Sequence, residues 1–115
     1  EGIGFATNAI IEAYRDAGLN INEIYAVGGG TKNKVWSQAT SDCAGITQKL
    51  RRFSFGASYG DAYLAGRAIG DLQADAIEAW NPVESAIAPN RETSSLYQDA
   101  YRRFITLYKA TTDIL

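Results

Sequence analysis

The sequence predicts an α/β fold with an incomplete parallel sheet and several helices. Apolar residues recur at helical spacing in the first 17 positions. A short apolar run, 24–27, and a weaker strand pattern, 46–50, follow with a helical pattern between them. The order helix, strand, helix, strand and then helices is typical of a parallel strand pair joined by a crossover helix. Because two strands do not form a self-sufficient sheet, we expect the remaining strands to lie upstream of Glu1.

The first half of the chain supplies the elements of this strand pair. A first helix is predicted over 5–17 and is ended by Gly18. The buried strand Ile24–Val27 enters a glycine loop directly. A second helix carries Val35, Trp36, Ala39 and Cys43 on one face, and the weaker strand 46–50 follows it.

The second half is predicted to be helical. The small apolar residues of 56–70 predict a buried helix, and 72–80 predicts a further short one. The stretch 81–90 contains two prolines and is expected to be an irregular link. Asn90 is a candidate cap for the last helix. This amphipathic helix carries an aromatic stripe of Tyr97, Tyr101, Phe104 and Tyr108.

Composition excludes several classes of function. The 115 residues suffice for one domain, and hydrophobic residues make up 46% against 21% charged residues. The net charge of −2, without a concentrated basic face, argues against nucleic acid as a partner. The absence of histidine excludes imidazole-based catalysis and His-ligated zinc. Cys43 is a lone cysteine. Without an apolar run that could span a bilayer, we expect a cytoplasmic protein with no membrane partner.

Gly28, Gly29 and Gly30 form the most informative motif. A glycine turn between a strand and a helix lets a ligand approach the bare backbone, and it leaves N–H groups free at the positive end of the helix dipole. Such a turn suits phosphate, ribose or a base edge, although a packing turn without a ligand gives the same pattern. The spacing fits neither the dinucleotide fingerprint G-x-G-x-x-G, because its last place is Asn33, nor a P-loop.

The stretch 28–38, GGGTKNKVWSQ, followed by Asp42 and Gly45, resembles the FGGY carbohydrate kinases, whose C-terminal domains carry GGG-[AT]-K-[SN]-x-x-W-x-Q and then A-D-x-x-G. The stretch 56–62, GASYGDA, resembles the later family segment G-A-x-G-A-A. The opening stretch 1–5, EGIGF, resembles the family's E-G-[IV]-A-F, and the resemblance extends over all 115 residues. Ser37 and Asp61 depart from the family pattern.

The resemblance implies a fold and a function. FGGY kinases have two domains of the actin-like, ribonuclease H-like ATPase fold and transfer the γ-phosphoryl group of MgATP to a sugar hydroxyl. Residues 1–115 would be the C-terminal portion of the second, nucleotide-binding domain, without the N-terminal sugar-binding domain. Gly28, Gly29 and Gly30 would line the adenosine side of the site, and Asn33 would face the adenine. The partners would then be ATP or ADP and a small sugar, for which a pentulose is our preferred hypothesis; the resemblance also allows a homodimer.

The catalytic base and the Mg²⁺ ligands are expected outside this chain, so no catalytic or metal residue is assigned and the chain alone is expected to be inactive. Two alternatives stay open: a non-kinase member of the actin-like ATPases, and an interaction module without a ligand. Of the other polar residues, we expect Asp42 to fix a turn, Gln38 to be a structural hydrogen bonder and Lys32 to be solvated. Trp36 is predicted to lie in the core.

Overall fold

The computed structural model describes residues 1–112 and has the expected α/β organisation. Its helices and strands are, in chain order, α1 (Gly2–Asp16), β1 (Glu23–Ala26), the 3₁₀ helix η1 (Gly29–Lys32), α2 (Lys34–Ala44), β2 (Thr47–Arg51), α3 (Ala57–Ala68), α4 (Ile77–Trp80), β3 (Val83–Ile87) and α5 (Ser94–Thr112). None of the helices in this part of the chain is long and apolar enough to span a bilayer.

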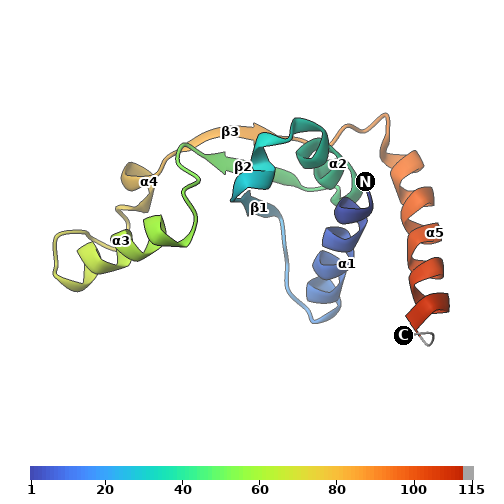
Figure 1. The fold of residues 1–115 in the computed structure, drawn as a ribbon, viewed down its shortest axis with the longest axis horizontal. Coiled ribbons are helices and arrows are strands. Elements are labelled where there is room, and N and C mark those ends of the chain that lie inside the picture. Colours follow the sequence, from blue (N-terminus) through green and yellow to red (C-terminus); the bar gives the residue numbers. More distant parts are fainter. Residues whose placement is uncertain (113–115) are drawn as a thin grey trace.

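The sheet has three strands in the order β1-β2-β3 (Figure 1). β1 and β2 run parallel, with Glu23 opposite Thr47 and Ala26 opposite Leu50, so the predicted parallel pair is confirmed. β3 pairs antiparallel with β2. The prediction of an irregular link over 81–90 is therefore wrong for Val83–Ile87. This segment is mostly exposed and forms a strand because its backbone pairs with β2.

A small apolar core lies where α1 and α2 meet the sheet. Ile11, Ala44 and Ile46 are buried there, with Ile21 and Ile24 packed against them. Gly4 faces α2, and a Cβ at this position would lie in ordinary van der Waals contact with the backbone of Ala39, at 3.5 Å. Small residues therefore face each other where α1 packs on the helix that follows the glycine turn.

Hydrogen bonds between buried polar side chains hold α2 on the sheet. The Gln48 side chain, 5% exposed, donates to the carbonyl of Ser37 at 2.5 Å and to the hydroxyl of Ser41 at 2.8 Å. Ser41 is fully buried and donates to the carbonyl of Ile87 at 2.9 Å. The side-chain donors of Gln48 and Ser41 are therefore paired, and their hydrogen bonds join α2 to both β2 and β3.

The last helix docks on α1 through its aromatic stripe. Phe5, 8% exposed, has its ring centroid within 6.3 Å of those of Tyr97, Tyr101 and Phe104. The stripe prediction is confirmed for these three rings, whereas Tyr108 is 61% exposed. The predicted cap is wrong in detail, because α5 begins at Ser94. Asn90 instead opens the preceding turn, and its side chain accepts from the N–H of Glu92.

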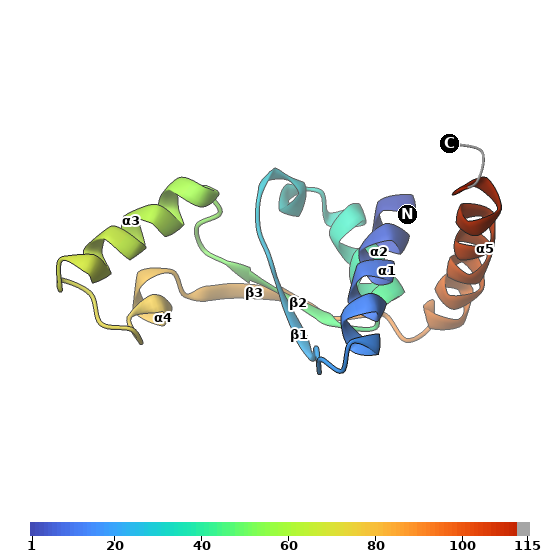
Figure 2. The ribbon, with the colours of Figure 1, turned by 90° about the horizontal axis from the view of Figure 1, so that it is seen from below.

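Helices α3 and α4 extend away from the rest of the molecule, at the far end of β2 and β3 (Figures 1 and 2). The radius of gyration is 17.1 Å, whereas a compact domain of this length has about 13 Å. The prediction of a buried helix over 56–70 is wrong within the described residues, because α3 has no buried residue. Small residues allow a helix to pack closely, but burial also requires a second element that packs against it. Here the rings of Tyr59 and Tyr63 on α3 contact the ring of Trp80 on α4.

Candidate functional site: the triglycine turn

The triglycine turn, Gly28–Gly30, lies between the end of β1 and the start of α2. β1 ends at Ala26, and a single residue, Val27, leads into Gly28. Gly29 then begins the short helix η1, which ends at Lys32 just before α2. The turn therefore stands at the carboxyl end of a parallel strand, the edge where open α/β sheets bind their ligands.

The three glycines meet different structural requirements. Gly28 has φ 90° and ψ 178°, a conformation that residues with a side chain rarely adopt. Gly30 lies against Trp36, and a Cβ there would come within 2.7 Å of the indole ring. At Gly29, φ is not positive and a Cβ would meet no atom within 4 Å. Neither backbone conformation nor packing against the described residues requires glycine at 29.

Asn33 and Trp36 lie at the start of α2, directly after the turn and η1. The Asn33 side chain caps α2, its Oδ1 accepting the N–H of Trp36 at 3.1 Å. This use leaves the amide NH₂ of Asn33 without a partner among residues 1–112, and the side chain is exposed. Trp36 is 38% exposed, so the prediction of a core residue is wrong; its ring instead forms the surface against which Gly30 packs.

The backbone of the turn presents free hydrogen-bond donors. Within residues 1–112, the N–H groups of Gly29 and Gly30 have no hydrogen-bond partner, whereas those of Thr31 and Asn33 bond back to the turn. The start of the 11-residue helix α2 adds the positive end of its dipole. Lys32 is exposed, as predicted for a solvated side chain. These donors suit an anion or the acceptor atoms of a nucleoside.

Two hollows flank the turn. One, of about 250 Å³, is lined by Gly30, Thr31 and Trp36 together with residues of α1 and the sheet. The other, of about 340 Å³, lies beside Val27 under the start of α3 and has aromatic walls. No carboxylate lines either hollow. A larger hollow, of about 680 Å³, lies elsewhere, between α1, α2 and α5, and is lined by no residue of the turn.

Two hydroxyl groups hold the peptide groups of Gly28. The N–H of Gly28 donates to Ser54 Oγ at 2.7 Å. Thr31 Oγ1 donates to the Gly28 carbonyl at 2.8 Å. Thr31 belongs to the sequence block already singled out, but Ser54 was missed. A single serine 26 residues downstream gives no periodic or motif signal, and only the parallel pairing of β1 and β2 brings it to the turn.

The remaining polar residues of the block are structural. Asp42 does fix a turn, but a distant one: its carboxylate accepts the N–H of Asn90 at 2.7 Å and the hydroxyl of Thr93 at 3.3 Å. Gln38 donates to Asp42 at 2.8 Å and to the Ala88 carbonyl at 2.9 Å, as expected of a structural hydrogen bonder. Burial raises the pKa of the Cys43 thiol to about 11, so Cys43 remains a neutral thiol.

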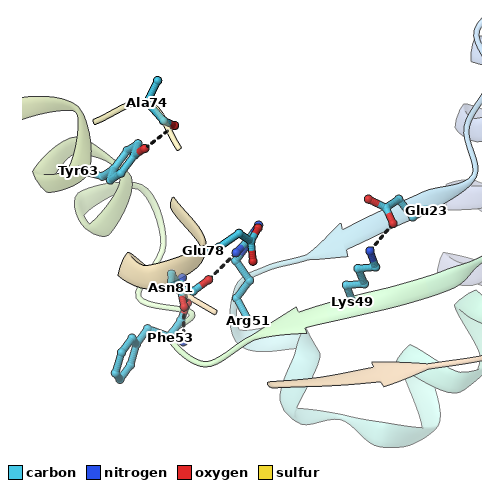
Figure 3. Close-up of polar contacts among 8 residues, drawn as sticks. All are labelled: Glu23, Lys49, Arg51, Phe53, Tyr63, Ala74, Glu78 and Asn81. Atoms are coloured by element: carbon cyan, nitrogen blue, oxygen red, sulfur yellow. Dashed lines mark hydrogen bonds and ion pairs between the residues drawn. The ribbon is translucent and has the colours of Figure 1, made fainter. Parts of the chain in front are cut away.

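Charged side chains of the sheet and of α4 form ion pairs (Figure 3). Lys49 pairs with Glu23, and its hydrogen bond lowers the pKa of that carboxyl. Arg51 pairs with Glu78 at 2.8 Å, and its hydrogen bond lowers the pKa of that carboxyl. The Arg51 guanidinium also stacks on the Tyr25 ring. Within residues 1–112 no cluster of three or more acidic, cysteine or histidine side chains could hold a metal ion.

Residues 1–69 match the model of the C-terminal domain of the FGGY family of carbohydrate kinases. This chain belongs to that family. The match contains the triglycine turn, α2, Ser54 and all of α3. It also confirms the resemblance on which the sequence-based predictions depended.

Individual FGGY proteins resemble the chain over nearly its whole length. A xylulose kinase of Staphylococcus epidermidis is 31% identical over 116 residues, which cover 99% of this chain and 23% of the relative. A ribulokinase of Shouchella clausii is 30% identical over 94% of this chain and 21% of its own length. The crystal structure of a xylulose kinase from Rhodospirillum rubrum superposes with a TM-score of 0.82 at 25% identity, over 97% of this chain and 23% of that one.

The likeness to these proteins establishes the fold but not the activity of the complete protein. The α/β arrangement of α1–α5 is that of part of an FGGY kinase, which has the actin-like ATPase fold. The chain spans less than a quarter of the length of each of these three relatives. Activity, substrate and partners of the complete protein are therefore matters for proposal.

Proposed function

We propose that the complete protein carrying this chain transfers the γ-phosphoryl group of ATP to a hydroxyl of a small sugar, and that this chain supplies the adenosine side of the nucleotide site. Residues 1–115 are then the C-terminal portion of the nucleotide-binding domain. The relatives named xylulose kinase and ribulokinase support a ketopentose as the acceptor. We propose that the complete protein is located in the cytoplasm.

The observation that carries this proposal is the open backbone at Gly29. Its two neighbours must be glycine for reasons internal to the fold, but at Gly29 the space for a side chain is empty. The free N–H groups of Gly29 and Gly30 belong to the same turn. Space and donors together fit a ligand that approaches the backbone closely, as a nucleotide does at a glycine turn.

The described residues fit a nucleotide better than a metal. Gly28, Gly29 and Gly30 would contact the ribose and the neighbouring phosphate through the main chain. The Asn33 amide NH₂, free after Oδ1 has capped α2, would donate to a ring nitrogen of the adenine. Since no metal cluster lies within residues 1–112, Mg²⁺ would bind through the ATP phosphates and residues outside this chain.

This chain's part in phosphoryl transfer is positioning. The transfer depends mainly on alignment and charge neutralisation, and it needs a group that accepts the proton of the attacking hydroxyl. No carboxylate lines either hollow beside the turn, and we expect that base to come from a part of the complete protein outside this chain. Holding the adenosine end fixes where the γ-phosphoryl group lies and thereby lowers the entropic cost of the reaction.

Replacing Gly29 with leucine in the complete protein should raise the KM for ATP about tenfold, a loss of about 1.4 kcal/mol of binding. The backbone tolerates the change, because φ at Gly29 is not positive and a Cβ meets no atom within 4 Å. The leucine side chain would fill the space that the nucleotide needs. Steady-state kinetics with each substrate varied in turn measures this effect.

The controls for this test are the smaller variant Gly29→Ala and the second substrate. Alanine should raise the KM for ATP less than leucine does, because it adds only one methyl group. The KM for the sugar should stay within about twofold in both variants, a margin of roughly 0.4 kcal/mol. An unchanged ATP dependence in Gly29→Leu would rule out the turn as part of the nucleotide site.

A further inference from the structure

The first glycine of the turn depends on a hydrogen bond from outside the turn. Gly28 has positive φ and lies two residues beyond the end of β1, outside the pairing of β1 with β2. Ser54 Oγ accepts this N–H at 2.7 Å and lies 3.5 Å from the Gly28 carbonyl oxygen. Ser54 belongs to the connection between β2 and α3, so the bond joins the ends of two neighbouring parallel strands.

The backbone that carries Ser54 is itself held in place (Figure 3). Phe53, the residue before Ser54, forms two hydrogen bonds with the side chain of Asn81, which is 7% exposed. The Asn81 side chain accepts the Phe53 N–H at 2.9 Å and donates to the Phe53 carbonyl at 2.9 Å. Arg51 donates to the carbonyl of Asn81 and pairs with Glu78. A continuous set of polar contacts therefore leads from α4 through Phe53 and Ser54 to Gly28.

We propose that Ser54 is a positioning residue for nucleotide binding. By accepting the Gly28 N–H it keeps the turn in the one conformation that presents the N–H groups of Gly29 and Gly30 to the ligand. Ser54 acts through Gly28 and need not touch the nucleotide. This inference rests on the proposed function, because it concerns the same turn.

The physical basis is a population effect. Without an acceptor, the Gly28 N–H would seek water, and the glycine-rich turn would sample other conformations at little cost. The apparent dissociation constant of a ligand then rises by the inverse of the fraction that keeps the competent conformation. The loss of one such hydrogen bond corresponds to about a threefold to tenfold weaker affinity.

The test compares Ser54→Ala, Ser54→Thr and Ser95→Ala in the complete protein. Threonine keeps the acceptor oxygen, while Ser95 is an exposed serine of α5 whose hydroxyl has no partner within residues 1–112. ADP binding is measured by calorimetric titration. We expect Ser54→Ala to raise the dissociation constant of ADP about threefold to tenfold, while Ser54→Thr and Ser95→Ala stay near wild type.

Two further readouts separate positioning from a general loss of structure. The KM for the sugar should not change in Ser54→Ala, and hydrogen exchange should accelerate at the Gly28 amide but not in α2 or β2. Wild-type affinity for ADP in Ser54→Ala overturns the inference, as does an equal loss for ADP and sugar. If Gly29→Leu weakens ATP binding while Ser54→Ala does not weaken ADP binding, the positioning role of Ser54 is wrong but the proposed nucleotide site stands. If the wild-type protein does not bind ADP, both the positioning role of Ser54 and the proposed function are contradicted.

Discussion

Replacing Phe5 with alanine lowers the free energy of opening of α5 by about 3 kcal/mol, at the lower end of the range for buried phenylalanine. The ring is 8% exposed and has three aromatic neighbours on α5, at centroid distances of 5.6–6.3 Å. Truncation removes these contacts and leaves a cavity between α1 and α5. Hydrogen exchange of the α5 amides in the complete protein measures the opening free energy.

Two variants calibrate this expectation. Phe5→Leu keeps part of the apolar volume and should cost clearly less than alanine. Tyr108→Ala truncates a ring on the same helix that is 61% exposed, so it should cost less than about 1 kcal/mol. If Phe5→Ala leaves the protection of α5 unchanged, or if Tyr108→Ala costs as much, the docking of α5 through Phe5 is contradicted.

The second large effect is expected at Asp42. Asp42→Ala should destabilise the start of α5 by about 2–4 kcal/mol, because three part-buried hydrogen bonds lose their charged acceptor. The carboxylate is 7% exposed and accepts from Gln38, the Asn90 N–H and Thr93. The Asn90 N–H loses its acceptor altogether. Hydrogen exchange over 90–100 and thermal unfolding of the complete protein measure the loss.

Asp42→Asn is the matched control for that prediction. Its amide oxygen can still accept from Gln38 and the Asn90 N–H, and its NH₂ can donate to the Thr93 hydroxyl, so the loss should be about 1 kcal/mol. Within residues 1–112 no cation forms an ion pair with Asp42, so the difference between the two variants should not depend on salt. Equal losses for alanine and asparagine would show that hydrogen bonding is not what Asp42 contributes.

The first half of the fold could be predicted because its signals are local. Helical spacing, one short apolar run, a weaker strand pattern over 46–50 and a glycine after each helix locate α1, β1, α2 and β2 to within a few residues. Gly18 and Gly45 have positive φ where the helices end, as the sequence suggested. The triglycine turn was found for the same reason, since strand, glycines and helix are contiguous in the chain.

The second half was harder because its structure depends on partners distant in sequence. β3 carries Glu84 and Ser85 and lacks the alternation of a half-buried strand, so only its pairing with β2 reveals it. The small residues of α3 predicted burial, but burial requires a neighbour that residues 1–112 do not supply. Ser54 could not be predicted for the same reason, because its partner, the N–H of Gly28, lies 26 residues earlier in the chain.

A crystal structure of the complete protein with ADP tests the central claim most directly. The account predicts adenosine against the bare backbone of Gly28–Gly30, with the N–H groups of Gly29 or Gly30 hydrogen-bonded to the ligand and the Asn33 amide at the adenine. Bound ADP whose atoms all lie beyond contact distance of this turn would contradict the account, even if the protein proved to be an active sugar kinase.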